Sequence, residues 1–161
     1  MSTRFGIKGS DAPALLQHLG LRIPAQPNHV THWQSHDAWG SGRCLRQGST
    51  EFLIELDSAE KMPQLPANAG FPNAWSLIRC DHSQLLVGEA WLRDLPQVCS
   101  FDFTQLQDDP ELVVMTLLAS IGVTLIREPS GTTPEFALRL WCDASFSTYL
   151  QDCLNTIRGP R

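Results

Sequence analysis

Three histidines, His29, His32 and His36, form the densest group of potential metal ligands in the sequence. Imidazole rings three and four positions apart on a helix can share one metal ion. The segment follows Pro24 and Pro27, however, and the residue before a proline favours extended backbone, on which the three rings would not converge. No matched carboxylate or cysteine is placed to complete a ligand set. We therefore interpret them as loop histidines and predict no metal site.

The run Cys80-Asp81-His82-Ser83 combines a nucleophile, an acid and a base in consecutive positions. Neighbouring side chains on a strand point to opposite faces, and nucleophile and base are normally brought together from separate segments. A turn in which Asp81 and Ser83 bond to the backbone explains the run better. The sequence therefore predicts no catalytic residue.

Two glycines and a serine, Gly6, Gly9 and Ser10, lie at a predicted strand-to-helix junction. Such a junction can present backbone N–H groups to an anion. The spacing matches neither the phosphate loop nor the dinucleotide-binding motif, so we interpret these glycines as positions of tight backbone packing. No cofactor-binding residue is predicted in this chain.

The composition predicts one globular domain over residues 1–161. Hydrophobic residues make up 42% and charged residues 18%, and a chain of this length can bury a core without disulfides or a structural metal. Pro63, Pro66 and Pro72 with Gly70 mark a connecting loop, and a soft lobe boundary is expected at 57–74. The five cysteines are odd in number and never spaced C-x-x-C, which predicts reduced, mostly buried thiols.

The charge pattern excludes several partners. The net charge is −5, and the basic residues are scattered singly, so a nucleic acid would be repelled. No stretch approaches the ~20 continuous apolar residues that cross a bilayer, and the first eight residues lack the apolar run of a signal peptide. We expect a cytoplasmic protein that binds neither nucleic acid nor membrane.

Hydrophobic periodicity predicts an α+β fold of mainly antiparallel strands with flanking helices in two small lobes. Asp11 and Gly20 are expected to bound a first helix, and Asp143 is expected to cap a last one with a buried face that includes Phe146 and Tyr149. The segment 28–42 has no clean periodicity. The predicted strands are 5–9, 44–46, 51–56, 75–79, 84–87, 112–118, 121–127 and 135–141, and the predicted helices end at 19, span 89–95 and span 144–157.

Tryptophans supply the candidates for a partner interface. Trp141 ends a predicted strand and is expected in the core. Trp33 and Trp39 lie in polar surroundings in the sequence, so we predict that they contact a partner protein.

Several segments resemble the gamma subunit of heterotetrameric sarcosine oxidase, in the aminomethyltransferase-like, folate-binding superfamily. The strongest matches come last, in the closing strands and an S-F-x-x-Y-L helix at 145–150. The matching segments are 5–12 (FGIKGSDA), 21–24, 27–28, 45–53 (LRQGSTEFL), 81–83, 88–90, 99–103 (CSFDF), 116–119 (TLLA), 123–127 (VTLIR), 136–140 (FALRL) and 145–150 (SFSTYL).

The resemblance implies an aminomethyltransferase folate-binding-domain-like fold and a non-catalytic role in a complex that oxidatively demethylates an N-methyl amine. FAD, FMN, NAD and tetrahydrofolate would be bound by partner subunits, and this chain would dock on the large alpha subunit. The alternative hypothesis is a stand-alone folate-binding or one-carbon-transfer protein. A small metal protein built on the three histidines is the third and least favoured. The sequence leaves open the amine, the identity of the partners and the oligomeric state.

Overall fold

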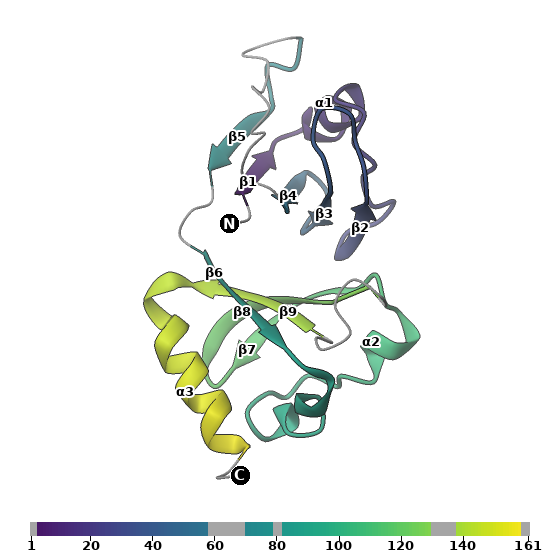
Figure 1. Ribbon diagram of the computed structural model, residues 1–161. Coiled ribbons are helices and arrows are strands. Elements are labelled where there is room, and N and C mark those ends of the chain that lie inside the picture. The colour runs from purple at the N-terminus through teal and green to yellow at the C-terminus, as the bar shows by residue number, and fades with distance from the viewer. Residues whose placement is uncertain (1–2, 58–69, 79–81, 130–137, 159–161) are drawn as a thin grey trace. The chain divides into compact units, whose positions relative to one another are not determined.

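The computed structural model describes residues 3–57, 70–78, 82–129 and 138–158 (Figure 1). The chain divides into two compact units, Met1–Cys80 and Asp81–Arg161. Each unit contains one antiparallel sheet and short helices, which confirms the predicted α+β class. The division falls after the segment 57–74, where the sequence predicted a soft boundary. Most of that segment lies outside the described residues.

Unit 1, Met1–Cys80, contains a five-stranded sheet in the order β2-β3-β4-β1-β5. The hairpin predicted from residues 44–56 is confirmed, because β3 and β4 pair antiparallel with Cys44 opposite Ile54. A strand in the segment without clean periodicity, β2, was not predicted. The elements are β1 Thr3–Lys8, α1 Ala12–His18, β2 His29–Trp33, β3 Gly42–Arg46, β4 Glu51–Leu56 and β5 Trp75–Ile78.

Alternation along the strands builds the core of unit 1. Phe5 and Ile7 of β1 and alternate apolar residues of β4 point to the same face, where they meet the buried side of α1. Helix α1 has the predicted boundaries: Asp11 precedes it, and Gly20 follows with a φ of 74°. The buried cluster contains Phe5, Ile7, Ala12, Leu15, Leu16, Leu21, Trp39, Cys44, Phe52, Ile54 and Leu56.

Unit 2, Asp81–Arg161, contains a four-stranded sheet in the order β6-β9-β8-β7. The predicted strands 112–118 and 121–127 are confirmed as β7 and β8. The strand predicted at 135–141 corresponds to β9, although residues 130–137 lie outside the described part. The elements are β6 His82–Val87, η1 Glu89–Trp91, η2 Leu95–Gln97, α2 Gln105–Asp108, β7 Val113–Leu118, β8 Ile121–Arg127, β9 Leu138–Asp143, η3 Ala144–Phe146 and α3 Ser147–Ile157.

The helix predicted at 89–95 is wrong, because the segment forms only the single 3₁₀ turns η1 and η2. Pro96 has no N–H group to extend the helical hydrogen bonds, and the cap residue Gly88 offers no side chain to the open N–H groups. The described residues contain no helix that could cross a bilayer; α3, the longest, has 11 residues.

The last helix, α3, covers one face of the unit 2 sheet (Figure 1). Asp143 precedes it as predicted, and its Oδ1 accepts a hydrogen bond of 2.8 Å from the Ser145 N–H. Leu150 and Leu154 are buried, but Phe146 and Tyr149 are exposed, so their predicted place on the buried face is wrong. Phe146 belongs to the 3₁₀ turn η3, whose tighter winding shifts it around the axis, whereas Tyr149 lies in α3 itself, about 100° around the axis from Leu150.

The turn between β7 and β8 consists of two residues, Ala119 and Ser120, with φ values of 50° and 68°. Positive φ at both positions defines the primed turn whose twist matches that of antiparallel strands. This turn normally contains Asn or Gly, because other residues pay a steric cost in left-handed backbone. Neither residue here is of that kind, so the turn stores strain.

Replacing Ser120→Gly should relieve part of this strain and raise the free energy of unfolding by about 1 kcal/mol. Urea unfolding followed by circular dichroism measures the change. Ser49, an exposed turn residue whose φ is not positive, provides the matched control. Ser49→Gly should lower stability by up to about 1 kcal/mol, because glycine only adds chain entropy there. Equal effects of the two substitutions would contradict the assignment of strain.

Candidate functional site

The three histidines do not converge. His29 and His32 belong to strand β2 and are an odd number of positions apart, so their side chains leave opposite faces. His36 lies beyond the strand, in a turn where its carbonyl accepts from the Gly40 N–H. In the described part of the chain, no group of three or more His, Cys, Asp or Glu side chains could hold a metal ion.

The structure describes part of the run Cys80-Asp81-His82-Ser83 and all of the glycine motif. Cys80 and Asp81 lie outside the described residues, and Ser83 belongs to β6 rather than to a turn. Gly9 has a φ of 118°, and a Cβ atom there would lie 1.9 Å from the Asn73 carbonyl oxygen. Its N–H donates to the Thr50 carbonyl, so the interpretation of tight backbone packing is confirmed.

The thiols are largely inaccessible. Cys44, Cys99 and Cys142 are buried free cysteines, and Cys153 is half-buried on α3, whereas Cys80 lies outside the described residues. Burial raises the pKa of the Cys44 thiol far above its ordinary value, although the charge of Arg46 opposes the shift. A thiol held neutral in this way is a poor nucleophile.

Each unit buries an arginine–glutamate pair. In unit 1, Arg43 on β3 lies opposite Glu55 on β4; its Nη1 donates to Glu55 Oε2 at 2.6 Å, and its Nη2 donates to Asp57 Oδ1 at 2.9 Å. In unit 2, Arg139 donates to Glu128. Arg43 and Glu55 are only 3% and 0% exposed. Removing one partner from an enclosed pair of this kind destabilises the fold, and the paired groups are poor candidates for contact with a substrate.

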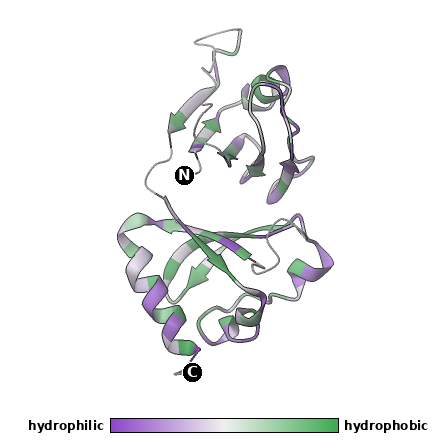
Figure 2. Cartoon of the chain, in the orientation of Figure 1, coloured by the Kyte–Doolittle hydropathy of each residue, from purple (hydrophilic) through white to green (hydrophobic). Residues whose placement is uncertain are grey.

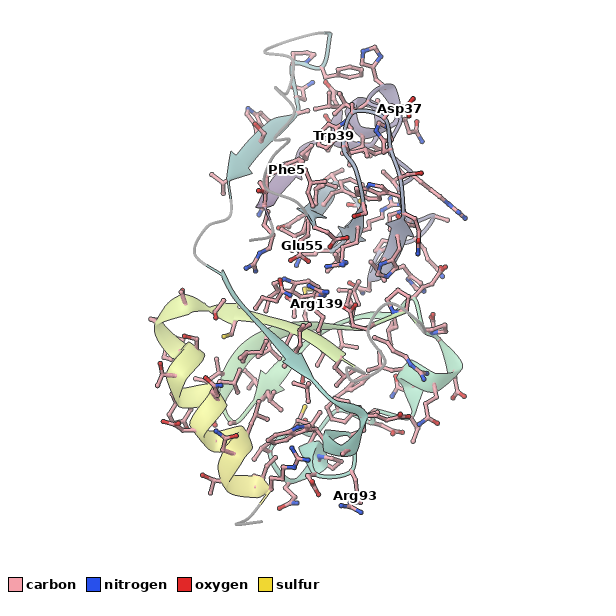
Figure 3. All side chains as sticks on the ribbon, viewed as in Figure 1. Phe5, Asp37, Trp39, Glu55, Arg93 and Arg139 are labelled. Carbon is pink, nitrogen blue, oxygen red and sulfur yellow. The ribbon has the colours of Figure 1, made fainter. Side chains whose placement is uncertain are left out.

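The two predicted interface tryptophans differ. Trp39 is 4% exposed and packs against Phe5, with 5.6 Å between ring centroids, so the expectation of polar surroundings is wrong for this residue (Figure 3). Trp33 is half-buried at the edge of the same apolar cluster. Trp141 is 2% exposed, as predicted for a core residue. Partner contact by Trp33 and Trp39 stays a prediction.

The largest exposed apolar side chains of the unit 2 sheet lie on β7. Met115 is 52% and Leu117 61% exposed, although both belong to a hydrophobic stretch of the strand (Figure 2). Beside them is a shallow, open hollow of about 570 Å³, which Gly122, Thr124 and Trp141 also line. A Cβ atom at Gly122 would meet no atom within 4 Å, so nothing within the described residues fills this space.

A second exposed pair lies on an edge strand of unit 1. Trp75 and Leu77 on β5 are 62% and 57% exposed. Sequence reasoning passed over both pairs, because an apolar strand residue is expected to be buried. Large exposed apolar side chains typically mark surfaces that contact other proteins. The candidate functional site of this chain is therefore a docking surface, and the β7 surface of Met115, Leu117 and the adjacent hollow is its best-formed example.

Comparisons with known proteins support a shared fold. No protein-family model and no curated protein matches the chain. Among solved structures, the fold is similar to a chain of heterotetrameric sarcosine oxidase from Corynebacterium sp. U-96, determined in complex with pyrrole 2-carboxylate, with a TM-score of 0.70 at 23% sequence identity. The match covers 99% of this chain and 83% of that chain. The architecture of a sarcosine oxidase chain therefore extends over nearly the whole sequence.

The structural role of the Arg43–Glu55 pair can be tested by replacing Arg43→Met. The change leaves the buried carboxylate of Glu55 without its main partner and should lower the free energy of unfolding by about 3–5 kcal/mol. Lys8→Met is the control, because the Lys8–Glu51 pair, at 2.6 Å, is 48% and 39% exposed and should contribute less than about 1 kcal/mol. Denaturant unfolding measures both. A loss from Arg43→Met as small as that of the control would contradict the assigned role.

Proposed function

We propose that this chain is a non-catalytic accessory subunit of a sarcosine-oxidase-like flavoenzyme complex, which oxidatively demethylates an N-methyl amine. The observation that carries the proposal is the match in fold, over 99% of the chain, to a chain of a heterotetrameric sarcosine oxidase. The resemblance of the closing strands and the S-F-x-x-Y-L helix supports the same assignment.

The side chains of this protein favour docking over chemistry. Among the described residues, Arg43 with Glu55 and Arg139 with Glu128 form enclosed charge pairs, which are poor candidates for contact with a substrate. Exposed apolar side chains are instead available on two edge strands, β5 and β7. As the family resemblance implies, we propose that the flavins, the nicotinamide dinucleotide and tetrahydrofolate are bound by partner subunits, with the large alpha subunit as the docking partner.

Co-expression with the large subunit of a sarcosine-oxidase-like enzyme tests the proposal. We expect one size-exclusion peak that contains both chains, absorbs as a flavoprotein and oxidises sarcosine or another N-methyl amine. The purified single chain should show no turnover. Elution of this chain apart from the large subunit would overturn the proposal, as would amine oxidation by this chain alone.

Calorimetry of the single chain with tetrahydrofolate distinguishes an accessory subunit from the alternative, a stand-alone folate-binding or one-carbon-transfer protein. A stand-alone folate-binding protein would release or absorb heat on titration, whereas an accessory subunit should give only heat of dilution. Saturable binding by the isolated chain would favour the alternative hypothesis.

A further inference from the structure

Strand β7 has one side of its backbone open. It is the last strand in the order β6-β9-β8-β7, so β8 is its one partner among the described residues. A two-residue primed turn makes its flanking residues, Leu118 and Ile121, a hydrogen-bonded pair. Because hydrogen-bonded positions alternate along an antiparallel strand, the N–H and C=O groups of Met115 and Leu117 point away from β8.

The open backbone coincides with the exposed side chains. Met115 and Leu117 are the residues whose side chains are 52% and 61% exposed on the face that adjoins the hollow. An occupant that satisfied both features would offer its own backbone donors and acceptors and an apolar side chain at alternate positions. An extended polypeptide segment has these properties. A helix has no free backbone groups to pair, and a small molecule would be poorly enclosed by so open a hollow.

Charge indicates the composition of that segment. No Lys or Arg occurs between Arg93 and Arg127, a stretch that contains β7 and five acidic residues. Among these acids, Asp102, Asp108 and Glu111 are exposed, and the last two come just before the strand. Unit 2 as a whole has 11 acidic against 5 basic residues, whereas unit 1 has 6 against 7.

The same charges disfavour a second copy of this chain as the occupant. Pairing β7 with β7 would bring together two copies of unit 2, each of which has 11 acidic and only 5 basic residues. Like charges placed opposite each other cost binding energy, whereas opposite charges speed association and fix register. The partner segment is therefore basic where it passes Asp108 and Glu111.

We propose that β7 accepts an added strand from a different protein chain: an extended segment that is apolar toward Met115 and Leu117 and carries Lys or Arg beside Asp108 and Glu111. The identity of the chain that donates the strand rests on the proposed function, under which it is the large subunit of the complex. The assignment of β7 as a strand-acceptor surface rests only on features of unit 2: the unpaired backbone of β7, its exposed side chains and the nearby acidic residues.

Replacing Leu117→Lys tests the apolar contact. The exposed position should tolerate lysine in the free protein, as an unchanged unfolding midpoint would confirm, while affinity for the co-expressed large subunit falls at least about tenfold. Leu86→Lys on β6 is the matched control, since it places the same charge at an exposed leucine on the opposite edge strand of the same sheet. Undiminished binding by Leu117→Lys, or an equal loss with Leu86→Lys, would overturn the proposal.

Replacing Glu111→Lys tests the charge. Association with the large subunit should slow by about tenfold at low salt, and the difference from wild type should shrink as salt rises. Asp152→Lys makes the same change at an exposed position of α3 and should leave the rate close to that of wild type. Slower association of both variants by the same factor would show that only net charge matters and would overturn the assigned position of the basic residues.

Binding of a synthetic peptide tests the strand-acceptor surface without the large subunit, and so independently of the proposed function. The probe alternates valine and threonine and carries lysines at both ends; its counterpart carries glutamates. We expect the lysine peptide to shift the amide resonances of β7 and the glutamate peptide to shift none. If the lysine peptide binds while the large subunit does not, the proposed function fails and the strand-acceptor surface stands. If the lysine peptide fails to bind, or if wild type dimerises in a way that Leu117→Lys abolishes, the surface is wrongly assigned.

Discussion

Strict alternation of side chains along antiparallel strands is the constraint on which this structure depends. In each unit, one set of alternate residues meets the helices and forms an apolar core, as Phe5 and Ile7 do beneath α1. The other set lies outside that core and includes the enclosed pair of Arg43 with Glu55 in unit 1, and Met115 with Leu117 in unit 2. A slip of one residue in register would exchange the two sets, so the turns that fix register also fix the character of both faces.

Local patterns in the sequence predicted most of the elements. The β-branched, apolar runs of β7 and β8 and the helix bounded by Asp11 and Gly20 were correctly placed. Strand β2 was missed because polar histidines interrupt its apolar pattern and Val30 is its one buried aliphatic side chain. The helix expected at 89–95 did not form because Pro96, just outside it, has no N–H group to extend the helical hydrogen bonds.

The candidate site was harder to predict, because it depends on the order of strands in space. Trp39 has polar neighbours in the sequence, yet it is covered by Phe5, more than thirty positions away along the chain. Met115 and Leu117 belong to an apolar run that would suit a central strand equally well. They are exposed because β7 ends the sheet, and single-sequence periodicity carries no information about which strand is last.

The segment Val113–Leu118 has no charged residue and no proline, and its β-branched and aliphatic side chains suit cross-β stacking. Such a six-residue edge is an aggregation hazard whenever the chain is made in excess of whatever covers it. Asp108, Asp109, Pro110 and Glu111 come immediately before it and act as gatekeepers, because charge and proline oppose fibril growth. Balanced synthesis with a binding protein, or prompt removal of the orphan chain by proteases, would therefore matter for this protein in the cell.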